Sequence, residues 1–257
     1  MSHGSLVHLK IDGHVASVTL DDPDRRNALG IPMFDALAEK LKTIRSDSGI
    51  HVVLLCGRGE AFCSGFDITA ALDDHALLGQ FIERLSLLLR TLRRLPQVVV
   101  AAVQGAAIAG GCAIVSACDL VVVSATARLG YPVHRIGLSP AVTIATLQQA
   151  IGPGAARATL LGGQLFDGAN ACRIGLAARL CPDDASVHTE AIRLCRSIAA
   201  HGPQALRATK RWLNELDGSL DDERFDRPAQ DSAATCTEEA RAMLARQVRK
   251  NLDGQHS

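Results

Sequence analysis

Residues 105–119, GAAIAGGCAIVSACD, could do chemistry mainly through their backbone. Glycines stand at 105, 110 and 111, and no acidic or basic side chain precedes Asp119. If a helix begins at Ala109–Gly111, its first amides have no intrahelical acceptor and its dipole favours negative charge. Glycine also lets another group approach the backbone closely. The segment therefore suits the binding of an electron-rich oxygen.

A second glycine turn occurs in AFCSGFDI, residues 61–68, after another apolar run. Two backbone amides from separate loops, facing one another, would form an oxyanion hole, which stabilises negative charge developing on a carbonyl oxygen. Both turns are equally compatible with simple tight connections between elements. Spacing alone leaves the site and the plain turn as open alternatives.

Apolar runs predict the strands that would deliver these turns. HVVLLCG (51–57), VVVAAV (98–103) and LVVVS (120–124) have the composition of buried strands. Residues 6–22 predict two further strands around a turn at Asp12–Gly13.

Helical patterns alternate with these strands and dominate after Thr143. Strands followed by crossover helices indicate an α/β core with parallel pairing. We predict a core over residues 1–199 and a helical C-terminal region over residues 200–257. The helices are expected at 32–45, 75–96, 110–118, 143–151, 154–162, 168–175, 186–200, 203–216 and 236–251.

Composition excludes several classes of partner. The 257 residues carry 27 basic and 27 acidic side chains, which gives no electrostatic case for nucleic acid or an anionic membrane surface. The aromatic content of 3% argues against base-stacking surfaces. Val98–Cys118 is a chargeless stretch of 21 residues, long enough to cross a bilayer. Its valine run and glycine interruptions favour a buried strand and a turn, so we predict no membrane span.

The eight cysteines form no CxxC pair, and the nine histidines form no HxxxH or HExxH motif. We therefore predict reduced, packed cysteines and no metal site. The N-terminal residues lack a basic region followed by a long apolar one, so we expect no secretory signal and a cytoplasmic location.

Three other glycine or serine motifs do not support their usual functions. Cys112 and Ala113 stand where a Walker loop needs lysine and a hydroxyl residue. Arg157 ends GPGAAR, where the dinucleotide fingerprint needs a small residue. Ser139 in GLSPA is followed by Pro140, which has no amide to donate to an oxyanion.

The motifs together, in this order, resemble the crotonase, or enoyl-CoA hydratase/isomerase, superfamily. The resemblance covers essentially the whole chain and includes the helical C-terminal region. The segments that carry it are RRNAL (25–29), AFCSGFDI (61–68), VQGAAIAGGCAIVSACDL (103–120), ARLGYPVHRIGLSP (127–140) and TLLGGQLFDGANACRIGLAARL (159–180).

The resemblance implies an α/β fold, a spiral of ββα turns with a helical C-terminal region that assembles trimers or dimers of trimers. It implies a coenzyme A thioester as substrate or ligand and no permanently bound cofactor. By position, the oxyanion donors are the backbone amides of Phe66 and Gly110. Positions that hold the CoA nucleotide in the family correspond to Arg26, Ala28, Ser64, Asp67 and Ile68.

The sequence departs from the family at its acid/base positions. Hydratases have one glutamate three residues beyond the oxyanion glycine and a second after the proline of the FGxPE motif. Here these positions are Ala113 and Val133. The aspartate of the dienoyl-CoA isomerase and dehalogenase branches corresponds to Ala141, and the histidine of the decarboxylase branch to Phe66. Water addition needs a base and an acid, which alanine and valine cannot supply.

A few polar residues are candidates to replace the missing groups. Tyr131 has a possible analogue in the decarboxylase branch, and His134 is adjacent to Val133, although neighbours on an extended segment point to opposite faces. Asp73, Asp74, His75 and Glu83 follow the GFD motif and are individually expected to be solvated. Cys112 is expected to be a packed small residue.

We therefore expect an acyl-CoA-binding protein whose oxyanion hole stabilises a thioester enolate, with slow or absent classical hydration. A different CoA-ester reaction, such as decarboxylation, isomerisation or thioester hydrolysis, remains open, as does non-catalytic acyl-CoA binding.

Overall fold

The computed structural model describes residues 5–73 and 76–253 and centres on a six-stranded sheet. The sheet order is β1-β2-β3-β4-β6-β9, with β1 and β2 antiparallel and the later pairs parallel. Its strands are β1 (Val7–Asp12), β2 (Val15–Leu20), β3 (Val52–Gly57), β4 (Val98–Val103), β6 (Leu120–Ser124) and β9 (Arg179–Cys181).

A second, three-stranded sheet lies beside the first and positions the glycine-rich segment. β5 (Ala106–Ile108) pairs in parallel with β7 (Arg128–Gly130), which pairs antiparallel with β8 (Leu165–Asp167). These strands are three residues long, so they carry no periodic pattern that sequence analysis could detect.

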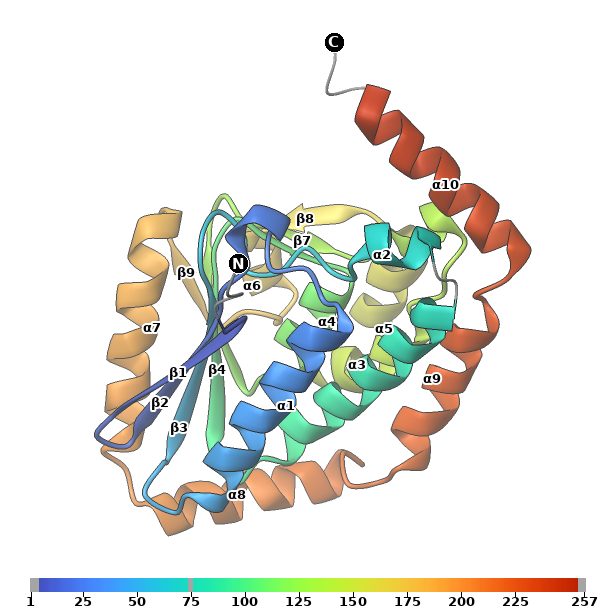
Figure 1. The fold of residues 1–257 in the computed structure, drawn as a ribbon. Helices are drawn as coiled ribbons and strands as arrows, with labels where there is room; N and C mark the ends of the chain where they lie inside the picture. Colours follow the sequence, from blue (N-terminus) through green and yellow to red (C-terminus); the bar gives the residue numbers. More distant parts are fainter. Residues whose placement is uncertain (1–4, 74–75, 254–257) are drawn as a thin grey trace.

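Helices cover both faces of the main sheet (Figure 1). Alternate β4 residues face opposite ways, because successive strand side chains point to opposite faces. Val99, Ala101 and Val103 join the larger apolar cluster, to which α1 (Ile31–Ser46), α3 (Ala76–Arg94) and α4 (Gly110–Ala117) contribute. Val98, Val100 and Ala102 pack with the inner face of α7 (Asp184–Ala199).

The remaining helices surround this core. α2 (Ile68–Asp73) precedes α3, and α6 (Gly168–Arg173) follows β8. α5 (Ile144–Gly162) is one element interrupted at Gly152 (φ 77°, ψ 161°) before Pro153, which agrees with the two separate helices expected there. Short 3₁₀ turns span Pro23–Arg25, Pro132–Ile136 and Ala141–Thr143.

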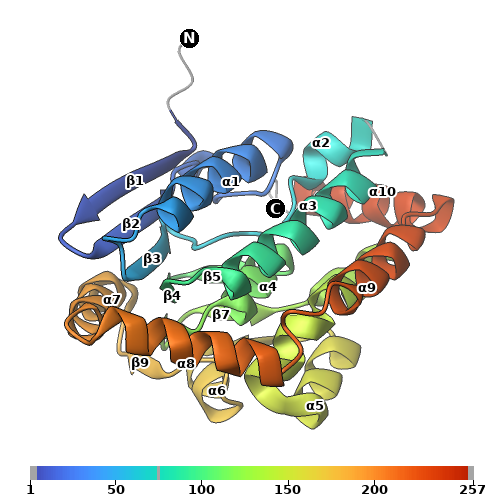
Figure 2. The same ribbon diagram turned by 90° about the horizontal axis from the view of Figure 1, so that it is seen from below.

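Three C-terminal helices close the fold: α8 (Pro203–Leu216), α9 (Glu223–Ala234) and α10 (Glu238–Asp253). α8 runs beneath the sheet from the α7 side to the α9 side (Figures 1 and 2). α9 packs on α3, where the Ser86 hydroxyl donates to the Phe225 carbonyl at 3.3 Å. α10 crosses the Pro132–Ile136 turn so closely that a Cβ on Gly137 would lie 2.7 Å from the Ala240 Cα.

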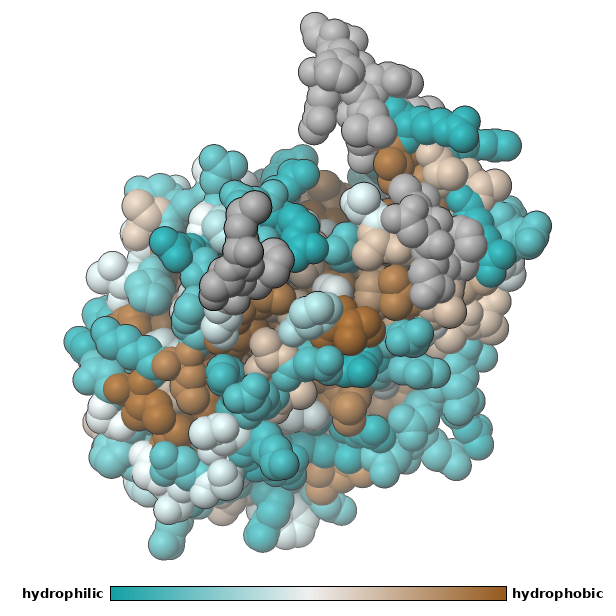
Figure 3. All heavy atoms as spheres, viewed as in Figure 1, coloured by the Kyte–Doolittle hydropathy of each residue, from teal (hydrophilic) through white to brown (hydrophobic). Residues whose placement is uncertain are grey.

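The chargeless stretch Val98–Cys118 forms β4, β5 and α4. Within residues 5–73 and 76–253, no helix is both long and apolar enough to cross a bilayer. All eight cysteines are free thiols, and six of them are buried, as expected from their apolar surroundings. The surface in Figure 3 is mostly hydrophilic, with an apolar patch on the side of β1 and β2, where Ile11 is exposed.

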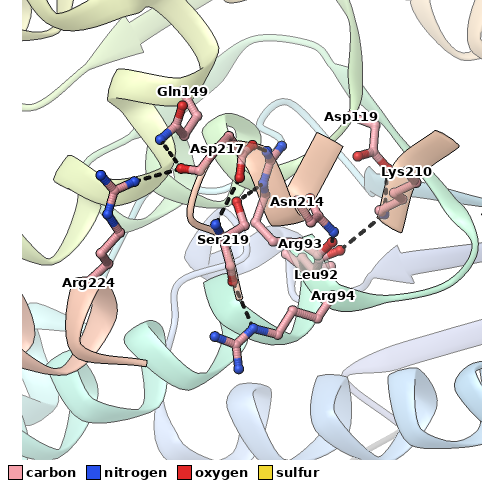
Figure 4. Close-up of polar contacts among 10 residues, drawn as sticks. All are labelled: Leu92, Arg93, Arg94, Asp119, Gln149, Lys210, Asn214, Asp217, Ser219 and Arg224. Atoms are coloured by element: carbon pink, nitrogen blue, oxygen red, sulfur yellow. Dashed lines mark hydrogen bonds and ion pairs between the residues drawn. The ribbon is translucent and has the colours of Figure 1, made fainter. Parts of the chain in front are cut away.

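Asp119 ties α8 to the sheet. Its carboxylate accepts from the Val99 amide at 2.7 Å and from the Lys210 ammonium at 2.6 Å. The same ammonium donates to the Gln97 carbonyl at 2.8 Å and to the Leu92 carbonyl at 3.4 Å, so this buried lysine has three oxygen acceptors. Figure 4 shows its contacts with Asp119 and Leu92. Burial lowers the pKa of Lys210, against the opposing effect of Asp119. Asp119 is therefore a structural residue of the α8 contact.

Removing one member of this pair should destabilise the fold more than removing both. Lys210→Met leaves a carboxylate without its ammonium, and we expect a loss of about 3 kcal/mol in the free energy of unfolding, measured with urea. Lys210→Met combined with Asp119→Asn should recover at least about 1 kcal/mol of that loss, since no unpaired charge remains.

The matched control is Lys42→Met, which removes an exposed lysine of α1 and should change stability by no more than about 0.5 kcal/mol. A double variant as unstable as the single one would contradict this account of the Asp119–Lys210 pair.

Candidate functional site

A cavity of about 230 Å³ lies where the glycine-rich segment meets α3, α10 and the 131–143 segment. Its lining is largely apolar and includes both residues expected to supply oxyanion donors, Phe66 and Gly110. The full lining is Ser64, Phe66, Ile68, Leu78, Ile82, Leu85, Ile108, Ala109, Gly110, Tyr131, Pro132, Val133, Arg135, Ile136, Leu138, Ser139, Pro140, Val142, Thr143 and Gln247.

The Gly110 amide is the first amide of α4 and has no acceptor among the described residues. β5 leads directly into this helix through Ala109, which has the unusual backbone angles φ 49° and ψ −109°. Two hydrogen bonds hold that conformation: the Ala109 amide donates to the Gly130 carbonyl at 2.8 Å, and the Ala113 amide donates to the Ala109 carbonyl at 2.9 Å. A non-glycine residue at such angles costs about 1–3 kcal/mol, so the surrounding contacts must enforce it.

The Phe66 amide is directed by a short parallel bridge to Leu29. The Leu29 amide donates to the Gly65 carbonyl at 2.7 Å, and the Asp67 amide donates to the Leu29 carbonyl at 3.1 Å. Because both bonds use the residues flanking Phe66, the Phe66 amide faces away from Leu29. No hydrogen-bond acceptor for it is present in residues 5–73 and 76–253.

The two glycine turns touch, as an oxyanion hole requires. Gly65 has φ +96°, and a Cβ built on it would lie 2.9 Å from the Ile108 carbonyl oxygen and 3.6 Å from the Gly110 nitrogen. A Cβ on Gly111 would overlap the Cys63 carbonyl. The Cys63 amide donates to the Ala106 carbonyl, and its carbonyl accepts from the Ile108 amide, each at 3.0 Å. Glycine at 65 and 111 is therefore what lets the loops meet.

Of the two positions where the family resemblance led us to expect glutamates, only Val133 borders this cavity. Val133 is part of its lining, and Ala113 is fully buried in α4, one turn beyond Gly110. Neither side chain can accept or donate a proton. Ala141 begins the short 3₁₀ turn after Pro140.

Two of the candidate replacement groups, His134 and Glu83, do not line the cavity. His134 is exposed, and its ring lies beside Gly163. The segment is a 3₁₀ turn rather than the extended chain we expected. The side chains of Val133 and His134 therefore diverge because of the turn and not because of strand alternation. Glu83 is exposed on α3. Asp73 ends α2, and its side chain, like Asp74 and His75, lies outside the described residues.

Tyr131 is a buried titratable residue of the cavity lining. It is fully buried, and its hydroxyl lacks a hydrogen bond of good geometry within the described chain, although Cys112, Ser116 and Thr143 are its polar neighbours. Burial raises the pKa of Tyr131 well above its ordinary value. The phenol therefore stays protonated near neutral pH and can donate but not accept a proton.

Cys112 is a packed thiol, as the sequence suggested. It is fully buried, and burial raises its pKa to about 12. A thiol that holds its proton so tightly supplies no thiolate nucleophile near neutral pH.

The five positions expected to hold CoA lie on the two segments beside the cavity. Ser64 and Ile68 line the cavity itself, while Ala28 and Asp67 line a neighbouring groove of about 350 Å³. Asp67 pairs with Arg25 at 3.1 Å and caps α2 through the Ala70 amide at 3.3 Å. Arg26 is exposed, with its own carbonyl accepting from the Ser64 amide at 3.0 Å.

Asn27 holds together two loops beside the cavity, and the sequence analysis did not identify it. It is fully buried at φ 55°, and its side-chain oxygen accepts from the Asp22 amide at 2.8 Å. Its side-chain nitrogen donates to the carbonyls of Arg58, Ala61 and Phe62 at 2.8–3.2 Å. One amide thus joins the 22–29 loop to the loop that carries Phe66. Asparagine tolerates left-handed angles, which is the only local signal of this role.

Comparisons with known proteins match most of the sequence and the fold. A family model described as enoyl-CoA hydratase/isomerase matches residues 10–238. A putative enoyl-CoA hydratase of Thermus thermophilus is 40% identical over 212 residues, covering 80% of this chain and 83% of the relative. The crystal structure of an enoyl-CoA hydratase from Mycobacterium avium has a TM-score of 0.83 at 30% identity, covering 96% and 98% of the two chains. An enoyl-CoA hydratase/isomerase from Xanthobacter autotrophicus Py2 has a TM-score of 0.87 at 26% identity, covering 97% and 95%.

Gly65→Ala should separate the two loops. The added methyl group meets the Ile108 carbonyl at 2.9 Å and sits at φ +96°, so we expect a loss of about 1–3 kcal/mol in unfolding free energy. Gly79→Ala is the control, because a Cβ there contacts nothing within 4 Å inside α3. It should leave stability unchanged or raise it by up to about 1 kcal/mol. Equal denaturation midpoints for Gly65→Ala and the parent protein would refute the close contact.

Proposed function

The chain belongs to the enoyl-CoA hydratase/isomerase family, and from that premise we propose that it binds short acyl-CoA thioesters and stabilises their enolates without classical hydration. The observation that carries the proposal is the pair of unengaged amides of Phe66 and Gly110, two residues that both line the cavity. In this proposal they donate to the thioester oxygen as negative charge develops on it. A preorganised donor of this kind lowers a barrier by roughly 3–4 kcal/mol.

CoA would lie along the segments that carry Arg26, Ala28, Ser64, Asp67 and Ile68, with the acyl group in the cavity. Ala28 and Asp67 support this path because they line the groove adjoining the cavity. Free thiols throughout the chain fit a reducing compartment, so the cytoplasmic location stays our prediction.

The chemistry available after carbonyl polarisation is limited by the absence of a base at the two family positions. Val133 and Ala113 cannot activate water, and the neutral Tyr131 phenol can only donate. The second candidate function is therefore a reaction in which the substrate forms the enolate without an enzyme base, such as decarboxylation of a malonyl-type ester. Isomerisation or thioester hydrolysis, and binding without turnover, are further alternatives that the same assays separate.

We expect hydration of crotonyl-CoA to be very slow or absent in purified protein, because no carboxylate stands at residue 113 or 133. The measurement is the loss of enoyl thioester absorbance, run beside malonyl- and methylmalonyl-type esters. A turnover number of tens per second or more, which is ordinary for an enzyme, would overturn this expectation.

The matched gain-of-function variant is Ala113→Glu combined with Val133→Glu. Hydratase activity in this double variant, and its absence in each single variant, would support an intact oxyanion hole and acyl cavity.

We also propose a homotrimer, or a dimer of trimers, built through the C-terminal helices. The supporting observation is an exposed apolar group on α8 and just after it: Trp212, Leu213, Leu216 and Leu220 are 42–80% exposed. A group of exposed large apolar side chains indicates an interaction surface, whereas a single exposed apolar residue is ordinary.

Light scattering should give at least three times the subunit mass of 27.2 kDa. Leu213→Ser combined with Leu216→Ser should shift the mass towards the monomer, while Leu87→Ser, at a similarly exposed leucine of α3, should not. A monomeric parent protein would disprove the assembly.

A further inference from the structure

The cavity beside Gly110 has two chemically different sides. Ile68, Leu78, Ile82 and Leu85, from α2 and α3, supply only apolar atoms. The segment 131–143 supplies the other side and carries polar side chains between apolar ones. The acyl group that fills this cavity should therefore have both an apolar part and a polar part.

Every polar side chain that the 131–143 segment contributes to the lining can donate a hydrogen bond. Tyr131 and Thr143 have enclosed hydroxyls for which the described residues provide no partner of good geometry. The Ser139 hydroxyl oxygen accepts from the Ala141 amide at 3.2 Å, which leaves its own O–H to donate. The Tyr131 hydroxyl has Cys112, Ser116 and Thr143 as polar neighbours, so the donors left for a ligand are the Ser139 hydroxyl and the Arg135 guanidinium. These donors favour a ligand that accepts hydrogen bonds over a plain alkyl chain.

The charge of the lining is positive. Arg135 lines the cavity, is exposed, and makes no ion pair with any residue in the described ranges. The described lining residues contain no aspartate or glutamate. A cleft lined by one sign of charge concentrates ligands of the opposite sign.

We propose that Arg135 binds a carboxylate at the far end of the acyl group, so that the cavity selects CoA thioesters of short dicarboxylic acids. This inference rests on the proposed function. A guanidinium group matches a carboxylate with two parallel hydrogen bonds, which an uncharged acyl end cannot accept. The volume of about 230 Å³ is below that of pockets for drug-sized ligands, which limits the acyl group to a short one.

The phosphates of CoA are a second source of anionic oxygen for the same guanidinium. We assign Arg135 to the acyl end because it belongs to the Pro132–Ile136 turn, which packs against α10. The positions proposed for CoA belong instead to the 26–28 and 64–68 segments, which are bonded to each other. The experiment separates the two sources.

Isothermal titration of the full chain should compare glutaryl-CoA, pentanoyl-CoA and free CoA. The two esters share their chain length and differ in a terminal carboxylate. We expect the parent protein to bind glutaryl-CoA at least about tenfold more tightly than pentanoyl-CoA, the factor expected for one charge-assisted contact. Arg135→Met should reduce this ratio to about one and leave pentanoyl-CoA and CoA binding unchanged. Arg135→Lys should retain part of the ratio, because it keeps the charge but loses the planar fork.

Arg157→Met, at an exposed arginine of α5, is the matched control and should keep the full ratio. Tight pentanoyl-CoA binding with no preference for glutaryl-CoA overturns the Arg135 assignment while the proposed function stands. An equal loss of all three ligands in Arg135→Met assigns the residue to CoA phosphates and also overturns it. Failure of the parent protein to bind any of the three ligands removes the proposed function itself.

Discussion

The close contact between two backbone turns is the constraint on which the rest of the site depends. Gly65 and Gly111 remove the side chains that would hold the turns apart, and the bonds of Cys63 to β5 fix their register. Ala109 accepts a strained conformation at the junction. Such strain persists only where surrounding contacts enforce it, and here it orients the first turn of α4 toward the cavity. The main sheet, the small sheet and Asn27 all act to hold these two turns.

In the proposed function, this arrangement separates carbonyl polarisation from proton transfer. Backbone amides need no particular side chain, so the polarising element can persist while residues 113 and 133 are apolar. Tyr131, which lines the cavity, and Cys112, which lies behind it in α4, hold their protons because burial raises the pKa of each. In the proposed function, the cavity therefore stabilises an anion that the substrate itself forms, and the polar side chains of the 131–143 segment are donors rather than bases.

The sequence predicted most of the elements because their signals are local. Continuous valine-rich runs identified β3, β4 and β6, since buried parallel strands are apolar on both faces. The α8 boundaries were predicted to the residue from a proline start and amphipathic spacing. The small sheet escaped detection because its strands are too short to show periodicity. α9 was also missed: Pro228 lies inside it, and a proline usually marks the end of a helix.

The site was only partly accessible from sequence for the same reason. Glycines marked the two turns, and the family resemblance assigned the backbone amides of Phe66 and Gly110 as the expected oxyanion donors. Asn27 acts through hydrogen bonds with a segment distant in the chain, and the proposed role of Arg135 depends on the cavity that distant segments form around it. No local sequence pattern indicates either role. The expected orientation of His134 relative to Val133 was wrong in its premise. It assumed an extended segment, whereas Pro132–Ile136 is a 3₁₀ turn.

The buried thiols can report local opening of the two apolar layers of the fold. Cys56 and Cys195 lie in the layer between the main sheet and α7, whereas Cys63 and Cys112 lie in the opposite layer, under the cavity. Alkylating reagents attack only an accessible thiolate, so each pair reacts only when its own layer opens. The labelling rate of Cys56 and Cys195 would therefore measure how often the layer beside α7 opens. The labelling rate of Cys63 and Cys112 would measure the opening of the opposite layer separately.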